Sequence, residues 1–174
     1  TPVVSAAETE KIPALSPDAI FYNGIILTMD DNQPQAQAIA IEGERILAVG
    51  TDGEILALKD SSTQLIDLQE TTVTPGFIDS HQHRIGNRIG GGIEEPEPII
   101  QLAIEQGWTS INELFVHEQR LNELRSLNEA GKLRLRVNGY LALHSPFGDP
   151  YGNWYQAYQP GFEYSPYLRL AGVK

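Results

Sequence analysis

The sequence contains no cysteine, which excludes disulfide frameworks, zinc sites built from thiolates and cysteine nucleophiles. Basic residues are also scarce, since 12 Lys and Arg stand against 23 Asp and Glu and give a formal net charge of -11 over 174 residues. Such a chain repels phosphate groups, so neither nucleic acid nor an anionic membrane is an expected partner. No apolar run approaches the roughly 18 residues that cross a bilayer. These absences favour a small-molecule or protein partner, and any metal ion must be held by His, carboxylate or a less usual ligand.

The composition is otherwise that of a globular protein, with 41% hydrophobic and 20% charged residues. Residues 1–17 are polar and carry no apolar periodicity, so we expect an extended lead-in there. That stretch is either what remains after removal of a signal peptide, which implies a periplasmic or secreted protein, or the trimmed start of a cytoplasmic one. The sequence leaves localisation open.

From residue 18 to residue 70 the hydrophobic pattern alternates with a period of two and is broken by turn residues. We predict a β-sandwich portion made of short antiparallel strands. Asn23-Gly24 accepts positive φ and predicts a tight hairpin between strands at 19–22 and 25–29. A second hairpin is expected around Glu42-Gly43-Glu44, followed by a short helix at 54–58 and a strand at 65–68.

From residue 71 to the end, strand and helix patterns alternate. Strands joined through helices predict parallel βαβ units, and therefore either a doubly wound sheet or a (β/α)₈ barrel. The expected strands cover 73–80, 109–115, 133–143 and 168–174, and the expected helices cover 98–105 and 117–130.

The strongest chemical signal is the stretch from Pro75 to His83, Pro-Gly-Phe-Ile-Asp-Ser-His-Gln-His. Alternate side chains of a strand share a face, so His81 and His83 are expected to converge at the end of the first parallel strand. Two imidazoles at that end predict a metal site where barrel enzymes carry their active sites, and the alternative is a chance pair of surface histidines in a loop. Asp79 is two residues before His81, and either supports the orientation of the histidines or is a buried structural carboxyl group.

The chain resembles the amidohydrolase superfamily of metal-dependent hydrolases, in the branch that includes N-substituted formamide deformylases. The resemblance is carried by the Pro75 to His83 stretch, by the hairpin from Glu42 to Gly50, by Gly107-Trp108-Thr109-Ser110 and by Gly172-Val173-Lys174. It implies a (β/α)₈ TIM barrel preceded by part of a small β-sandwich. Residues 71–174 then form the first half of the barrel, strands one to four.

The resemblance also implies a metal centre. One or two divalent ions, usually zinc, are bound by His81 and His83, and Lys174 matches the lysine that becomes N6-carboxylated and bridges two ions. An anionic carbamate suits such a bridge because two cations a few ångströms apart repel each other. The alternative is a plain lysine at a strand end. The general base that the resemblance implies is an aspartate expected beyond Lys174, so no catalytic residue is assigned within this chain.

The segment from Ser145 to Tyr167 is rich in aromatic residues and follows the third parallel strand. It predicts either the wall of a substrate pocket or a self-packed loop or subunit interface. His144, Trp154 and Tyr155 are the candidate substrate contacts.

The predicted function is hydrolysis of a non-peptide C–N bond by metal-activated water, with a small-molecule substrate and this chain as the amino-terminal part of the enzyme. Two alternatives remain. One is a non-catalytic binding module whose sheet is completed by a partner chain, and the other is an ester, lactone or phosphoester hydrolase with the same metal centre. In each case the remainder of the barrel comes from the same gene product or from a companion chain, and a homo-oligomer is also open. A barrel alone needs about 250 residues, so we expect the end at Lys174 to be a truncation of the sequence or a cleavage more than a natural terminus.

Overall fold

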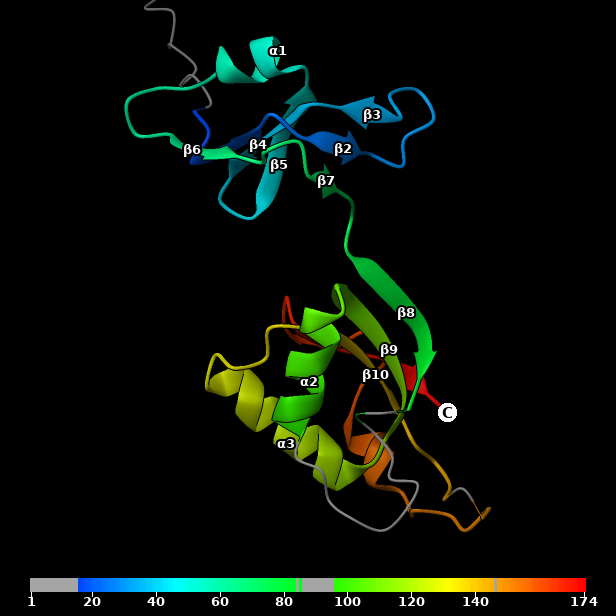
Figure 1. Ribbon diagram of the computed structural model, residues 1–174. Coiled ribbons are helices and arrows are strands. Elements are labelled where there is room, and N and C mark those ends of the chain that lie inside the picture. The colour runs from blue at the N-terminus through cyan, green and yellow to red at the C-terminus, as the bar shows by residue number, and fades with distance from the viewer. Residues whose placement is uncertain (1–15, 84, 86–95, 146) are drawn as a thin grey trace, which may run out of the picture. The chain divides into compact units, whose positions relative to one another are not determined.

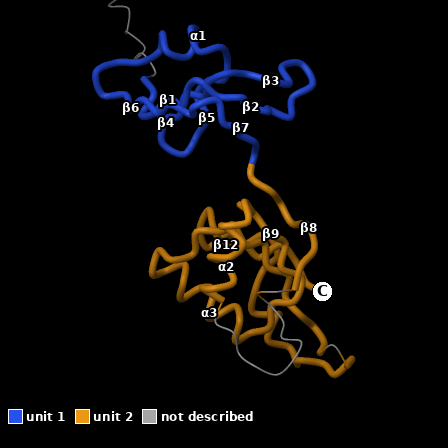
Figure 2. The backbone as a smooth tube through the Cα atoms, in the orientation of Figure 1, with its two compact units in different colours: residues 1–75 blue, residues 76–174 orange. Residues whose placement is uncertain are grey.

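A computed structural model describes residues 16–83, 85, 96–145 and 147–174, so the predicted lead-in over 1–17 lies almost entirely outside the described residues. The chain divides into two compact units, residues 1–75 and residues 76–174 (Figure 2).

In its described residues, 16–75, the first unit contains two small sheets and one short helix (Figure 1). Its larger sheet has the strand order β5-β4-β1-β6, and its smaller sheet has the order β3-β2-β7. The elements are β1 (Ala19–Tyr22), β2 (Ile25–Leu27), β3 (Gln35–Ala36), β4 (Ala38–Glu42), β5 (Arg45–Gly50), α1 (Asp52–Leu56), β6 (Gln64–Asp67) and β7 (Thr72–Val73). The predicted antiparallel pairing of β4 with β5 around the Glu42-Gly43-Glu44 turn is confirmed.

The hairpin predicted at Asn23-Gly24 is wrong, because β1 and β2 belong to different sheets. Asn23 does adopt the positive φ of 56° that the prediction required. However, the backbone groups of this turn bond to other segments. Gly24 donates its N–H to the Gln37 carbonyl (3.0 Å), and the Asn23 carbonyl accepts from Glu70 (2.7 Å). The turn therefore passes the chain from one sheet to the next.

The expectation of purely antiparallel strands in this unit is also wrong. β1 pairs in parallel with β6, and β2 pairs in parallel with β7. The long connection between β1 and β6 contains the β4–β5 hairpin and α1, which makes a parallel return possible. The β-sandwich itself stays a prediction.

The second unit contains a five-stranded sheet in the order β11-β12-β10-β9-β8. The strands β8, β9, β10 and β12 are mutually parallel, and β11 adds an antiparallel edge. The elements are β8 (Phe77–Gln82), α2 (Pro96–Glu105), β9 (Trp108–Val116), α3 (Glu118–Glu129), β10 (Arg136–Leu141), the 3₁₀ helix η1 (Trp154–Ala157), β11 (Glu163–Ser165) and β12 (Leu168–Val173). The predicted α/β arrangement with four parallel strands is confirmed, whereas closure into a barrel stays a prediction.

The core of this unit lies between the sheet and its helices. Figure 1 shows α2 and α3 against one face of the strands, and alternate residues of β9 and β10 are buried there. The buried side chains include Ile100, Ile111, Val116, Leu121, Leu124, Leu135, Val137, Leu168 and Leu170. Asn112 and Asn138 alternate with these buried positions and therefore lie on the opposite face of the sheet. None of the helices in the described part of the chain has both the length and the hydropathy to cross a membrane.

Helix α3 begins with an unusual cap. His117 is the N-cap residue, and its Nδ1 accepts a hydrogen bond from the backbone N–H of Arg120 at 3.4 Å. Burial lowers the pKa of His117, and the nearby charge of Arg120 lowers it further. The folded state therefore favours the neutral ring, which is also the form that can accept this hydrogen bond.

We predict that the free energy of unfolding falls as the pH drops below about 6.5, the ordinary pKa of histidine. A histidine whose pKa is lowered by folding binds more protons in the unfolded state, so its stabilising contribution is present above that pH and is lost below it. His117→Asn keeps a good N-cap that does not titrate, and should lose less stability between pH 7 and pH 5 in urea unfolding than the unsubstituted protein. His117→Ala should cost about 0.5–2 kcal/mol at pH 7. Equal pH dependence in H117N and the unsubstituted protein would contradict the assignment.

Candidate metal centre

The two predicted ligands come together at the carboxyl end of β8. The Nε2 atoms of His81 and His83 are 3.3 Å apart, and the ring centroids are 5.2 Å apart with an interplanar angle of 75°. Two nitrogen ligands about 2.0–2.1 Å from a tetrahedral ion lie about 3.3 Å from each other. The spacing of the two Nε2 atoms therefore fits two ligands of one ion, as well as a hydrogen bond between the rings.

An irregularity in β8 precedes the histidine pair. Asp79 is in register with Ile111 of β9, and Gln82 is in register with Glu113, so three steps along β8 match two along β9. One extra residue is accommodated between Asp79 and Gln82, as in a β-bulge. Strict alternation therefore does not extend across this stretch, and the argument that placed Asp79 in phase with both histidines does not hold.

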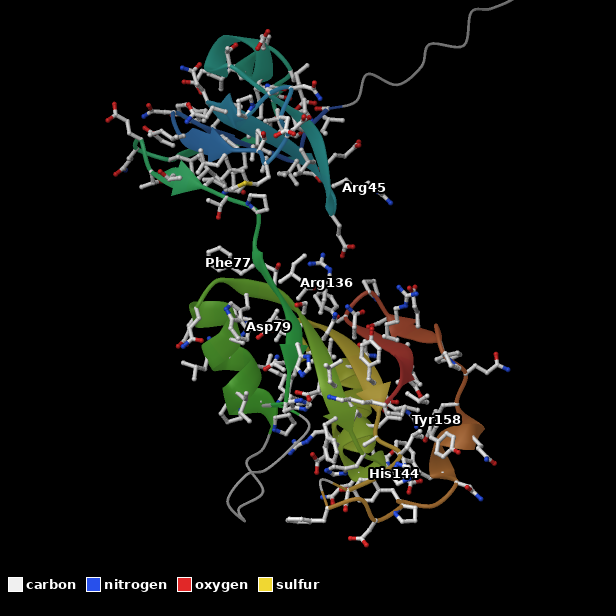
Figure 3. The ribbon with its side chains drawn as sticks, turned by 90° about the vertical axis from the view of Figure 1, so that its right-hand side faces the viewer. Arg45, Phe77, Asp79, Arg136, His144 and Tyr158 are labelled. Atoms are coloured by element: carbon white, nitrogen blue, oxygen red, sulfur yellow. The ribbon has the colours of Figure 1, made fainter. Side chains whose placement is uncertain are left out.

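Asp79 nevertheless contacts His81, the first of the two predicted ligands. Its Oδ1 accepts a hydrogen bond from the backbone N–H of His81 at 3.0 Å. The contact fixes the backbone of His81, and a role for Asp79 in orienting the imidazole stays a prediction. Figure 3 labels Asp79 on β8.

The pKa of His83 is lowered, first by burial and then by the positive charges of Lys174 and His81. A metal ion binds the neutral imidazole. The surroundings of His83 therefore favour the form of the ring that can act as a ligand.

Lys174 follows β12 directly, and its backbone is fixed to the neighbouring strand. Its N–H donates to the Leu141 carbonyl (2.8 Å), and its own carbonyl accepts from Leu143 (2.8 Å). The charge of Lys174 is close enough to lower the pKa of His83. Among the described residues, no group of three or more His, Cys, Asp or Glu side chains is arranged to hold a metal ion. What the structure brings together is thus two imidazoles with one lysine nearby.

A row of amide side chains, which sequence analysis missed, crosses the strands beside this centre. Asn112 of β9 donates to the carbonyl of Ser80 (3.3 Å), and Asn138 of β10 donates to the side-chain oxygen of Asn112 (3.0 Å). Asn112 lies between the buried residues Ile111 and Glu113, and Asn138 lies between the buried residues Val137 and Gly139, so both asparagines are on the face opposite the helix core. Polar residues at alternate positions of an apolar strand were the available sequence signal.

An aromatic contact chain also reaches His83. Its ring meets the ring of Phe115 edge to face at a centroid distance of 6.4 Å, and Phe115 meets Tyr151 in the same way at 6.1 Å. Tyr151 was part of the predicted aromatic segment, whereas Phe115 was not considered.

The three candidate substrate contacts, His144, Trp154 and Tyr155, lie on other segments of the chain than the histidine pair. Trp154 and Tyr155 of η1 are half-buried and pack against the hydrophobic core. His144 is exposed and forms an antiparallel bridge with Pro150, beyond the end toward which β8 runs (Figure 3). No contact between these three side chains and the histidine pair is recorded for the described residues, and their binding of substrate stays a prediction.

No family model matches this sequence. Over 64 residues it is 38% identical to the exoenzymes regulatory protein AepA of Pectobacterium carotovorum subsp. carotovorum, and over 66 residues it is 36% identical to the N-substituted formamide deformylase of Arthrobacter pascens. These alignments cover 37% and 38% of this chain but only 14% and 12% of the two relatives. An uncharacterized metal-dependent hydrolase from Pyrococcus furiosus has a similar structure, with a TM-score of 0.62 and 15% identity over 71% of this chain and 50% of that one. The chain thus spans a small part of the curated relatives that it matches, and the structural likeness concerns the fold.

Proposed function

We propose that this chain, which belongs to the amidohydrolase superfamily, is part of an enzyme that hydrolyses a non-peptide carbon–nitrogen bond with the help of a divalent metal ion. The observation that carries the proposal is the 3.3 Å separation of the Nε2 atoms of His81 and His83 at the end of a parallel strand. The relative named N-substituted formamide deformylase supports an amide-type substrate, and the fold shared with a metal-dependent hydrolase supports a metal ion.

Zinc is the ion that suits this site best, in one or two copies. Two imidazoles without thiolates are typical of catalytic zinc sites, which leave a position open for water or substrate. When bound, a divalent ion acts as a Lewis acid that lowers the pKa of a water to roughly 7 and polarises a carbonyl. The chain contributes the two ligands, a strand that holds them at the right spacing, and the aromatic contact of Phe115 that restricts the ring of His83.

Lys174 is proposed as a third ligand after carboxylation. The neutral amine adds to CO₂, a C–N bond forms, and one proton is released, which leaves a carbamate with a charge of minus one. This reaction turns a cation beside His83 into an anion, and an anion attracts the metal ion that a protonated lysine repels. The general base is not assigned to any residue of this chain.

The arrangement around the centre follows from the same proposal. The four parallel strands β8, β9, β10 and β12 form the first half of a (β/α)₈ barrel, and the unit before them forms part of a β-sandwich. The substrate enters at the carboxyl ends of the strands, where barrel enzymes place their active sites.

The proposal is tested by removing and restoring metal in the full-length protein. Dialysis against a chelator should abolish hydrolysis of N-substituted formamides or cyclic amides, and addition of zinc should restore it. The same preparation is assayed with esters, lactones and phosphoesters, which separates the alternative substrate classes. Retention of full amide hydrolysis after complete removal of metal would refute the proposal, and so would a metal-loaded protein that hydrolyses none of these compounds.

A further inference from the structure

Glu113 of β9 is a carboxyl-bearing residue with no exposed surface, 0% by relative area. It is flanked along the strand by Ile111 and Val116, which belong to the apolar core. Burying a carboxyl group costs free energy unless hydrogen bonds compensate for lost water. The contacts of Glu113 should therefore indicate what its burial achieves.

Both oxygens of Glu113 accept hydrogen bonds from backbone groups near His83. Oε2 accepts from the N–H of Ile85 at 2.8 Å, two residues after His83. Oε1 accepts from the N–H of Phe115 at 3.2 Å, and the ring of Phe115 contacts the ring of His83. One carboxyl group thus fixes the chain after His83 and the residue that packs against its imidazole.

The register adds a third constraint on the same segment. Glu113 pairs with Gln82, the residue before His83, and Gln82 is itself buried at 7% exposure. His83 lies between Gln82 and Ile85 in the chain. Gln82 is the strand-register partner of Glu113, and the N–H of Ile85 donates to the Glu113 carboxyl group. This support comes directly after the irregularity in β8, where strand pairing alone defines the backbone least.

We propose that Glu113 is a positioning residue for the metal centre, which holds the backbone and ring of His83 so that its Nε2 stays beside that of His81. The inference rests on the proposed function, because it concerns the affinity of the two histidines for a metal ion. Glutamate suits the position since two oxygens on a long side chain satisfy two N–H donors that lie on different segments.

Glu113→Gln in the full-length protein tests the inference. The substitution preserves shape but replaces one acceptor oxygen with an NH₂ group, so one of the two backbone N–H groups loses its partner. We expect zinc to bind about 10 to 100 times more weakly, as measured by competition with a chromophoric chelator. The absorption spectrum of the cobalt(II)-loaded variant should also change, because the geometry at His83 relaxes.

Two control variants separate positioning from general stability. Glu163→Gln removes an exposed carboxylate that pairs with Arg169 on β11 and β12, and should leave zinc affinity and the cobalt spectrum unchanged. Leu124→Ala removes a buried α3 side chain from the hydrophobic core and leaves both Glu113 hydrogen bonds in place, so it should lower the melting temperature more than it lowers zinc affinity. If E113Q weakens zinc binding only in proportion to its loss of stability, as L124A does, the inference is overturned.

The remaining outcomes are also decisive. Unchanged zinc affinity and an unchanged cobalt spectrum in E113Q overturn the inference. If E113Q does not fold, Glu113→Asp keeps the carboxyl group but shortens its reach, and a folded E113D with normal affinity overturns it too. Failure of both variants to fold shows a purely structural role. An unsubstituted protein that binds no zinc refutes the proposed function itself, whereas normal zinc binding in both proteins refutes only the role of Glu113.

Discussion

Alanine in place of His81 or His83 should abolish stoichiometric metal binding by the full-length protein and reduce hydrolysis to background. Each substitution removes one of the two proposed imidazole ligands, whose Nε2 atoms are 3.3 Å apart. Loss of a direct ligand should exceed the 10- to 100-fold weakening typical of changes to groups that only support ligands. We therefore expect the dissociation constant for zinc to rise by more than about 100-fold, as measured by chelator competition and metal analysis after gel filtration.

His144→Ala is the matched control for these variants. It removes an exposed imidazole from a residue whose backbone pairs with that of Pro150, away from β8, so zinc content should remain that of the unsubstituted protein. Folded His81→Ala and His83→Ala variants that keep full zinc content would show that the ion, if bound, has other ligands.

Gly76→Ala should destabilise the second unit and weaken the placement of β8. A Cβ on Gly76 would lie 2.0 Å from Cγ2 and 2.7 Å from Cβ of Thr109, which is closer than atoms can approach. The strands meet tightly here, since Phe77 donates its N–H to the Gly107 carbonyl at 2.9 Å. Forcing extra atoms into a packed contact typically costs about 1–3 kcal/mol, and urea unfolding measures this cost directly.

The steric origin of that cost is tested by a double-mutant cycle. Thr109→Gly removes the side chain that the new Cβ would meet, so the Gly76→Ala substitution should cost much less in the Thr109→Gly background. Equal costs in both backgrounds would mean that the contact with Thr109 is not responsible.

Regular hydrophobic periodicity predicted the strands and helices that bury one apolar face. Alternation identified the β4–β5 hairpin, and the strand and helix repeats identified the parallel strands with α2 and α3 against them. Local sequence signals gave a wrong prediction where hydrogen bonds to distant segments determine the course of the chain. Asn23 has the expected turn conformation, but Gln37 and Glu70 supply the hydrogen-bond partners of the turn, and neither can be inferred from the dipeptide.

The close approach of His81 and His83 was predictable from a local pattern, whereas the contacts of Glu113 and Phe115 with the His83 segment were not. Two histidines close together in one segment need only that segment to bring their rings together, so the motif alone predicts the pair. Glu113 and Phe115 contact the segment of His83 through the pairing of β8 with β9 and through an extra residue in β8. Strand register and bulges depend on the whole sheet, and a single sequence does not define them.

The most direct test of the metal centre is an anomalous difference map from crystals of the full-length protein soaked in zinc and measured on both sides of the zinc absorption edge. The account predicts a strong peak bonded to Nε2 of both His81 and His83, about 2.0–2.1 Å from each. A map without a peak at this position, in which the two rings remain hydrogen-bonded to each other as their 3.3 Å separation also allows, would contradict it.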